Sequence, residues 1–87
     1  MIINRHHELK TESSFFQLVE SGEKRFEVRK NDHHFHIFDT VTLLETVNGA
    51  PTGRTYGPVK IDFVLTNAAR FGLAEGFCIF TWKAPAE

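Results

Sequence analysis

Residues 22–32 have the sequence Gly-Glu-Lys-Arg-Phe-Glu-Val-Arg-Lys-Asn-Asp, which combines a glycine, an apolar alternation and a concentration of charge. Gly22 follows an apolar segment with helical spacing, and glycine readily adopts the left-handed conformation that ends a helix. Beyond it, Phe26 and Val28 share one face of a predicted strand, because successive strand side chains project to opposite faces. The charged residues on the other face are Arg25, Glu27 and Arg29.

The charges of this stretch allow two interpretations. Lys24, at the mouth of the strand, could form a small polar cleft with Glu27 and Arg29 that holds an anionic or hydrogen-bonding ligand. Alternatively, the strand lies at a solvated edge, where opposite charges pair for little energy. The pattern alone favours the solvated edge, because any half-exposed strand alternates charged and apolar residues.

Composition predicts one globular domain spanning residues 1–87. The chain is 41% hydrophobic and has nine phenylalanines, enough large rings to build a core at this length. Its one cysteine, Cys78, lies in the apolar run 77–80 and is expected to be a buried thiol. No stretch has the length of a membrane span or the pattern of a signal peptide, so we expect a cytoplasmic protein. The net charge of −1 excludes a broad basic surface for nucleic acid, and leaves a focused pocket as the alternative.

Upstream of the central stretch, the sequence predicts a short extended segment over residues 7–10 and then a helix. Ser14, with Gln17 three residues later, fits a capping box at the start of this helix, which is expected to end before Gly22. The apolar stripe of the helix is predicted to consist of Phe15, Leu18 and Val19.

Downstream, turn residues and apolar alternation predict three more strands. The strands are expected over residues 40–46, 59–66 and 77–82, with a turn at 30–34, a loop at 48–53, an irregular connection at 67–76 and a frayed tail at 83–87. The last strand is apolar on both faces, which is typical of a central strand. The predicted fold is α+β: a small mixed or antiparallel barrel of five to six strands with one N-terminal helix packed at its opening.

Four short motifs carry a family resemblance. They are His7-x-Leu9-Lys10, Gly22-x-Lys24-x-Phe26-Glu27-x-Arg29-x-Asn31-Asp32, Phe35-x-Ile37-x-Asp39 and Thr52-Gly53-Arg54. Together they resemble the DUF3850 family of small proteins, which is similar to the ASCH domains of the PUA-like superfamily. The resemblance runs from about His6 to Phe80, and its most specific part is the Gly-x-Lys-x-x-Glu-x-Arg signature of residues 22–29.

The resemblance implies a PUA-like pseudo-barrel with a cleft between the helix and the signature strand, which would bind RNA or a nucleotide-like ligand. It makes the binding cleft the favoured interpretation of the signature. The family pattern has a glycine before the aspartate of the third motif, whereas here Phe38 precedes Asp39. If that position has a positive φ, a phenylalanine there is strained.

The first functional hypothesis is therefore a module that binds RNA or a nucleotide without a cofactor or metal, as a monomer or weak homodimer. Tyr56, in a polar glycine-containing loop, is the expected stacking residue, while Phe26 and Trp82 are expected to pack in the core. The expected ligand-binding residues are Lys10, Lys24, Glu27, Arg29, Asn31, Asp32 and Tyr56.

The alternative is a small amidohydrolase that acts on acylated cytidine-type nucleosides, as some ASCH-like proteins do. Lys24 would act as nucleophile or base and Glu27 as proton carrier. Those enzymes have a threonine where Glu27 stands, and Glu75 is the candidate for their distant carboxylate.

Metal binding is a third hypothesis, raised by the chain's histidines. These are His6, His7, His33, His34 and His36. No cysteine or carboxylate cluster completes a tetrahedral site, so they are expected to be surface residues.

Overall fold

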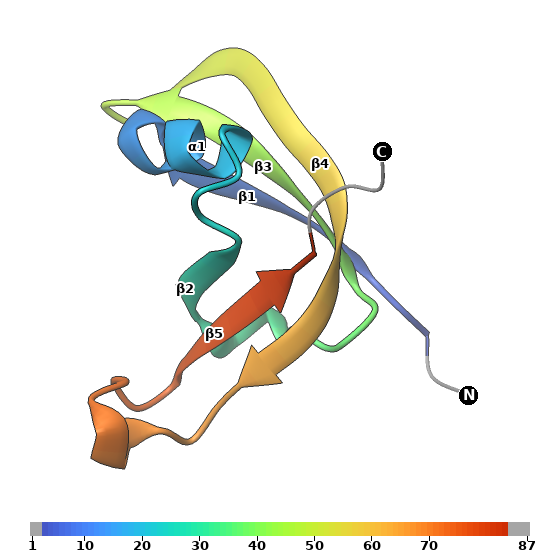
Figure 1. Ribbon diagram of the computed structural model, residues 1–87, viewed down its shortest axis with the longest axis vertical. Helices are drawn as coiled ribbons and strands as arrows, with labels where there is room; N and C mark the ends of the chain where they lie inside the picture. The colour runs from blue at the N-terminus through green and yellow to red at the C-terminus, as the bar shows by residue number, and fades with distance from the viewer. Residues whose placement is uncertain (1–2, 84–87) are drawn as a thin grey trace.

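Five strands and one helix make up the part of the chain that the structure, a computed structural model, describes, which is residues 3–83 (Figure 1). The elements are β1 (His6–Glu12), α1 (Ser13–Glu20), β2 (Phe26–Lys30), β3 (Thr40–Val47), β4 (Ala50–Leu65) and β5 (Phe77–Trp82). Short 3-10 turns cover Asn31–His33 and Ala69–Phe71. The α+β class is confirmed, and no helix among these residues is long and apolar enough to cross a membrane.

The strands form one mixed sheet in the order β1-β3-β4-β5-β2. β1 pairs with β3 in parallel, and the other pairs are antiparallel. The 16-residue strand β4 pairs with β3 and then with β5, and Figure 1 shows it curving along the whole molecule. The two edge strands, β1 and β2, have no ladder between them. The prediction of a closed barrel is therefore wrong, although the number of strands was anticipated.

The turn between β3 and β4 is tighter than the predicted loop over residues 48–53. Val47 pairs with Ala50, so only Asn48 and Gly49 connect the strands, with φ angles of 50° and 80°. Positive φ at both positions is the geometry of a type I′ hairpin, for which Asn-Gly is the preferred sequence. β4 consequently begins at Ala50, nine residues before the predicted strand.

Helix α1 differs from prediction in its start and in its buried face. It begins at Ser13, and Glu12 at the N-cap makes no side-chain cap, so the Ser14–Gln17 capping box is wrong. Phe16 and Val19 are buried, whereas Phe15 and Leu18 are exposed, because adjacent phenylalanines permit two different apolar stripes. The predicted end at Gly22 is confirmed, with φ at 85° and its N–H bonded to the Val19 carbonyl.

The core lies between α1 and the inner face of the folded sheet. Its members are Leu9, Phe16, Val19, Phe35, Val41, Leu43, Val59, Ile61, Cys78, Phe80 and Trp82. The predicted burial of Cys78 and Trp82 is thus confirmed, and burial raises the pKa of the Cys78 thiol. The remaining part of the predicted tail, residues 84–87, lies outside the described residues.

The N-terminal side of α1 is held to the sheet by the buried carboxylate of Glu45 on β3. It accepts hydrogen bonds from the hydroxyls of Ser13 (3.0 Å) and Thr52 (2.6 Å), while Arg54 lies 3.7 Å away. The bond from Thr52 is the largest influence on this carboxyl, and its pKa is lowered despite burial. Glu45 thereby joins α1, β3 and β4 at one point.

The loop that leads into β3 is fixed by a second buried carboxylate, that of Asp39. It accepts hydrogen bonds from the backbone N–H of Arg5 (3.0 Å), from His7 Nε2 (2.9 Å) and from the N–H of His36 (3.1 Å). An ionised carboxylate only accepts, so His7 Nε2 carries the hydrogen. Burial alone would raise the pKa of Asp39, but these donors outweigh it and lower the pKa below 3.8.

Phe38, just before Asp39, occupies a backbone conformation that suits glycine. Its φ is 75° and its side chain is 60% exposed, while its N–H donates to the Ile61 carbonyl at 2.8 Å. The strain anticipated from the missing glycine is therefore present.

We expect Phe38→Gly to raise the free energy of unfolding by about 1 kcal/mol, because glycine relieves the left-handed strain and little packing is lost. Urea denaturation measures this change. Ile37→Gly is the matched control: Ile37 is similarly exposed but has no positive φ, so glycine there should destabilise. A destabilised Phe38→Gly variant would contradict the assignment of strain.

Asp39→Asn should lower the free energy of unfolding at neutral pH by about 2 kcal/mol, because three donors lose a charged acceptor. The folded-state pKa is depressed, so the carboxyl's contribution is complete above its unfolded value near 3.8 and is lost as the pH falls through the folded value. Denaturation curves from pH 7 to the acid limit should therefore converge for wild type and variant. Asp32→Asn, at an exposed carboxylate, is the control. It should change neither the free energy of unfolding at neutral pH nor its dependence on pH.

Candidate functional site

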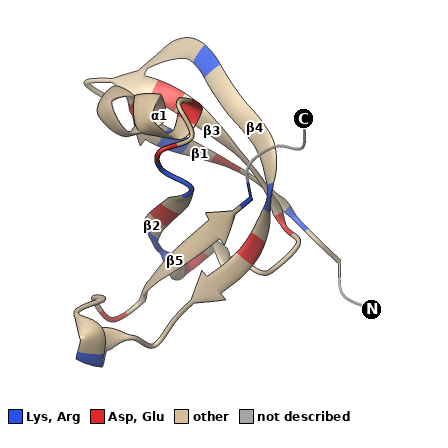
Figure 2. Ribbon diagram, in the orientation of Figure 1, with Lys and Arg blue, Asp and Glu red and all other residues tan. Residues whose placement is uncertain are grey.

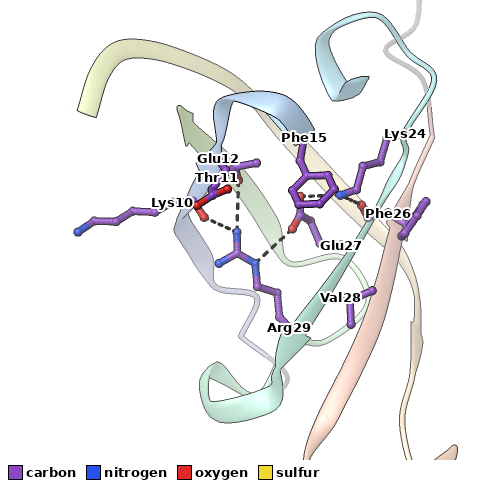
Figure 3. Close-up of a pocket in the computed structure, with 9 residues that line it drawn as sticks. All are labelled: Lys10, Thr11, Glu12, Phe15, Lys24, Phe26, Glu27, Val28 and Arg29. Atoms are coloured by element: carbon purple, nitrogen blue, oxygen red, sulfur yellow. Dashed lines mark hydrogen bonds and ion pairs between the residues drawn. The ribbon is translucent and has the colours of Figure 1, made fainter. Parts of the chain in front are cut away.

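A cleft of about 370 Å³ occupies the gap between the two edge strands (Figure 3). The last residues of β1 and the ring of Phe15 on α1 contribute to its lining. The other lining residues belong to residues 24–29, which run into β2. The lining residues are Lys10, Thr11, Glu12, Phe15, Lys24, Phe26, Glu27, Val28 and Arg29. Three of the four signature residues, Lys24, Glu27 and Arg29, therefore line the cleft.

The register between β2 and β5 decides which side chains of β2 point inward. Glu27 pairs with Phe80, which is fully buried, and paired residues lie on the same face of a sheet. Glu27 is therefore buried, at 5% exposure, while Phe26 and Val28 are 43% and 48% exposed. The expectation that Phe26 packs in the core is wrong. The apolar residues of β2 would be expected to face the core, but the register with β5 turns Glu27 inward and Phe26 outward.

Glu27 is the centre of a closed ionic network. Its Oε1 accepts from Lys24 Nζ at 3.0 Å, and its Oε2 accepts from Arg29 Nε at 3.2 Å. Lys24 Nζ also donates to the Phe26 carbonyl at 2.6 Å. The interpretation of these charges as a solvated edge is excluded, since the side chains of Lys24 and Glu27 are only 11% and 7% exposed.

Arg29 joins the two edge strands across the gap. Its Nη2 donates to the Lys10 carbonyl at 2.5 Å and lies 3.3 Å from Thr11 Oγ1, both on β1 (Figure 3). These bonds replace the absent backbone ladder at this point. Within the described residues, Arg29 Nη1 has no hydrogen-bond partner, so a donor remains on the 26%-exposed side chain for a ligand.

Two phenylalanine rings border the Lys24 ammonium. The nitrogen lies 5.5 Å from the ring centroid of Phe15 and 4.8 Å from that of Phe26, within cation–π range. Both rings are about half exposed, at 52% and 43%. The cleft therefore has a charged, hydrogen-bonded floor and an aromatic rim.

The hydrogen bonding of Lys24 bears on the amidohydrolase alternative. Lys24 Nζ donates to a carboxylate and to a carbonyl, so two of its hydrogens are already engaged by acceptors of the chain itself. Figure 2 shows positive and negative residues interspersed along β2 and the segment before it. Residues 21–30 contain four basic and two acidic side chains, so positive charge is in local excess.

The other residues predicted to bind ligand lie in different positions. Lys10 contributes its carbonyl, and its side chain points away from the cleft in Figure 3. Asn31 Oδ1 accepts the N–H of Phe35, Asp32 is exposed in the following turn, and Tyr56 on β4 packs against the core. None of these last three lines the cleft.

The histidines and the candidate carboxylate Glu75 are also dispersed. His7 is buried at 6% exposure by its bond to Asp39, so the expectation of a surface position is wrong for it. His6 bonds to Thr40, and His33 stacks on Phe35 with ring centroids 5.6 Å apart. Over residues 3–83, no group of three or more His, Cys, Asp or Glu is arranged to hold a metal ion. Glu75 is exposed between the second 3-10 turn and β5, outside the cleft lining.

Sequence reasoning missed Phe15, Thr11 and the exposure of Phe26. The signal available for Phe15 was the neighbouring Phe16, since only one of two adjacent helical residues can face the core fully. For Phe26, no local signal was available, because its orientation is set by the pairing of β2 with β5.

Known proteins share sequence similarity with the region that contains the cleft. The family described as a domain of unknown function (DUF3850) matches residues 6–82. The chain is also similar to an uncharacterised 12.9 kDa protein in the GpA 3′ region of Escherichia phage P2, with 46% identity over 48 residues. The similar region is 55% of this chain and 44% of the phage protein, so less than half of that protein is spanned. The family match includes every residue that lines the cleft.

We expect Glu27→Gln to lower the free energy of unfolding by roughly 3 kcal/mol, because Lys24 would stay buried without its counter-charge. Glu23→Gln makes the same chemical change at an exposed position of the same segment and should cost almost nothing. Urea denaturation of the two variants measures the difference.

Adding Lys24→Met to Glu27→Gln should restore part of the lost free energy of unfolding, because the double variant no longer has a buried lysine without its counter-charge. Equal stability of the Glu23 and Glu27 single variants would contradict the importance of the network.

Proposed function

The chain belongs to the DUF3850 family, and we propose that it binds one unpaired nucleotide, free or within single-stranded RNA, in the cleft between β1 and β2. The resemblance of its motifs to ASCH domains supports this proposal. The five-stranded mixed sheet with a helix between β1 and β2 is compatible with a PUA-like architecture, which we include in the proposal.

The observation that carries the proposal is the pairing of an aromatic rim with a donor-rich floor. Phe15 and Phe26 offer ring faces on which a base can stack, and stacking tolerates any base. Arg29 Nη1 offers a donor to a phosphate or to an acceptor on the base edge. Stacking is thus assigned to Phe15 and Phe26 in place of Tyr56.

The size and charge of the cleft favour a single nucleotide over a duplex. Its volume of about 370 Å³ is at the lower end of ligand pockets. The chain has a net charge of −1, and a duplex binder needs many phosphate contacts from an extended basic surface. An unpaired base inserted at one point requires only a few contacts.

The carboxylate of Glu27 has two roles in the proposed complex. It orients Lys24 and Arg29 through its two oxygens, and each oxygen keeps a lone pair that can accept from a base amino group. The ligand would therefore meet a prearranged set of groups, which lowers the cost of ordering side chains on binding.

Titration with single-stranded RNA, mononucleotides and N4-acetylcytidine, followed by backbone amide NMR shifts, tests the proposal. We expect saturable shifts in residues 10–12 and 24–29, and Phe26→Ala should weaken binding about tenfold by removing a stacking surface. Phe71→Ala, at a phenylalanine exposed outside the cleft, is the matched control and should bind as wild type.

The comparison of oligonucleotides with mononucleotides distinguishes RNA from a free ligand. Equal affinity of Phe26→Ala and wild type, or shifts that avoid the cleft, would refute the binding site. Acetate release that is lost in Lys24→Ala would instead establish the amidohydrolase alternative.

A further inference from the structure

The outward face of β2, β5 and the end of β4 is apolar. The three strands lie side by side in the order β4-β5-β2 (Figure 1), and the register aligns their outward residues in rows. One row joins Phe26, Thr81 and Phe63, and the next joins Val28, Ile79 and Leu65. Phe77 continues the face beside Lys30.

This face departs from the usual pattern of an antiparallel sheet. A sheet with one face in water normally has polar residues at its outward positions. Here Phe26, Val28, Phe63 and Leu65 are 43%, 48%, 52% and 38% exposed. The apolar character of both faces of β5 predicted a strand covered on both sides, but the described residues cover only the inner one.

We propose that this sheet face is the interface between two copies of the chain. Four side chains about half exposed, together with the half-buried Phe77 and Ile79, present on the order of 400 Å² of apolar surface. A stable interface buries about 800 Å² per partner, of which roughly 60% is apolar, so the face supplies most of the requirement.

Charge also favours a second copy as the occupant. The outward rows carry Lys30 and, bonded to the Thr81 hydroxyl, the carboxylate of Asp62. These charges are of opposite sign, and the chain's net charge of −1 adds little repulsion between copies. An isologous pair needs a patch that complements itself, and a flat apolar sheet face meets that need. Nucleic acid is a poorer occupant, because its phosphates would lie over a surface with a single cation.

The proposed interface adjoins the cleft. Phe26 and Val28 belong to both the sheet face and the cleft lining, so a second copy would border the cleft along β2. The dimer nevertheless goes beyond the proposed function, because it requires no ligand, and it is tested without one.

Sedimentation equilibrium from roughly 10 µM to 1 mM, the range of a moderate apolar interface, tests this inference. We expect wild type to form a dimer, and Val28→Lys to weaken association about a hundredfold, since each dimer would bury two lysines. Val47→Lys is the matched control, because Val47 is a strand valine with 49% exposure outside the face. It should associate as wild type.

Phe63→Lys repeats the test from β4, at a residue outside the cleft lining, and should also abolish the dimer. Dilution of wild type should shift amide signals of β2, β5 and the end of β4, which requires no variant to fold. A wild type that stays monomeric at 1 mM would overturn the inference and leave the face to a different protein. A dimer that resists both Val28→Lys and Phe63→Lys would overturn it as well.

Discussion

Arg29 spans a gap that the backbone leaves open. The sheet folds so that its two edge strands face one another, yet no ladder joins them, and Nη2 of Arg29 reaches the Lys10 carbonyl instead. The arginine is itself aligned by Glu27, which also neutralises Lys24. One buried carboxylate therefore sets the positions of both cations and, through Arg29, the separation of β1 and β2. The cleft lies between β1 and β2 because a side chain, that of Arg29, connects these two strands where no backbone hydrogen bonds do.

The same arrangement explains why β2 has its charges inside and its phenylalanine outside. An inward glutamate is costly without partners, and here both oxygens have cationic donors. Moving Glu27 inward places Phe26 and Val28 outside, where they form the cleft rim and part of the apolar sheet face. The polar floor and the exposed apolar surface are thus two consequences of a single strand register.

Much of this could be predicted from sequence, because several signals are local. Gly22 ending the helix and the strand over residues 77–82 follow from spacing within a few residues. The association of Lys24, Glu27 and Arg29 was favoured by the family resemblance, because the local pattern alone indicated a solvated edge. The orientation of Phe26 could not be predicted, since it depends on pairing with Thr81, 55 positions away. The Asn48–Gly49 hairpin was predictable from its dipeptide, but the surrounding proline and glycines suggested a longer loop.

The parallel pairing of β1 with β3 has a consequence for how the chain reaches its native state. The β3–β4 hairpin joins neighbours across a two-residue turn, so it can form early and without a large loss of chain entropy. β1 must then be added across a loop of more than two dozen residues that contains α1 and β2. Contacts of such sequence separation slow folding. The strand that contributes one wall of the cleft is therefore among the last elements expected to dock, and the cleft is assembled at the end of folding.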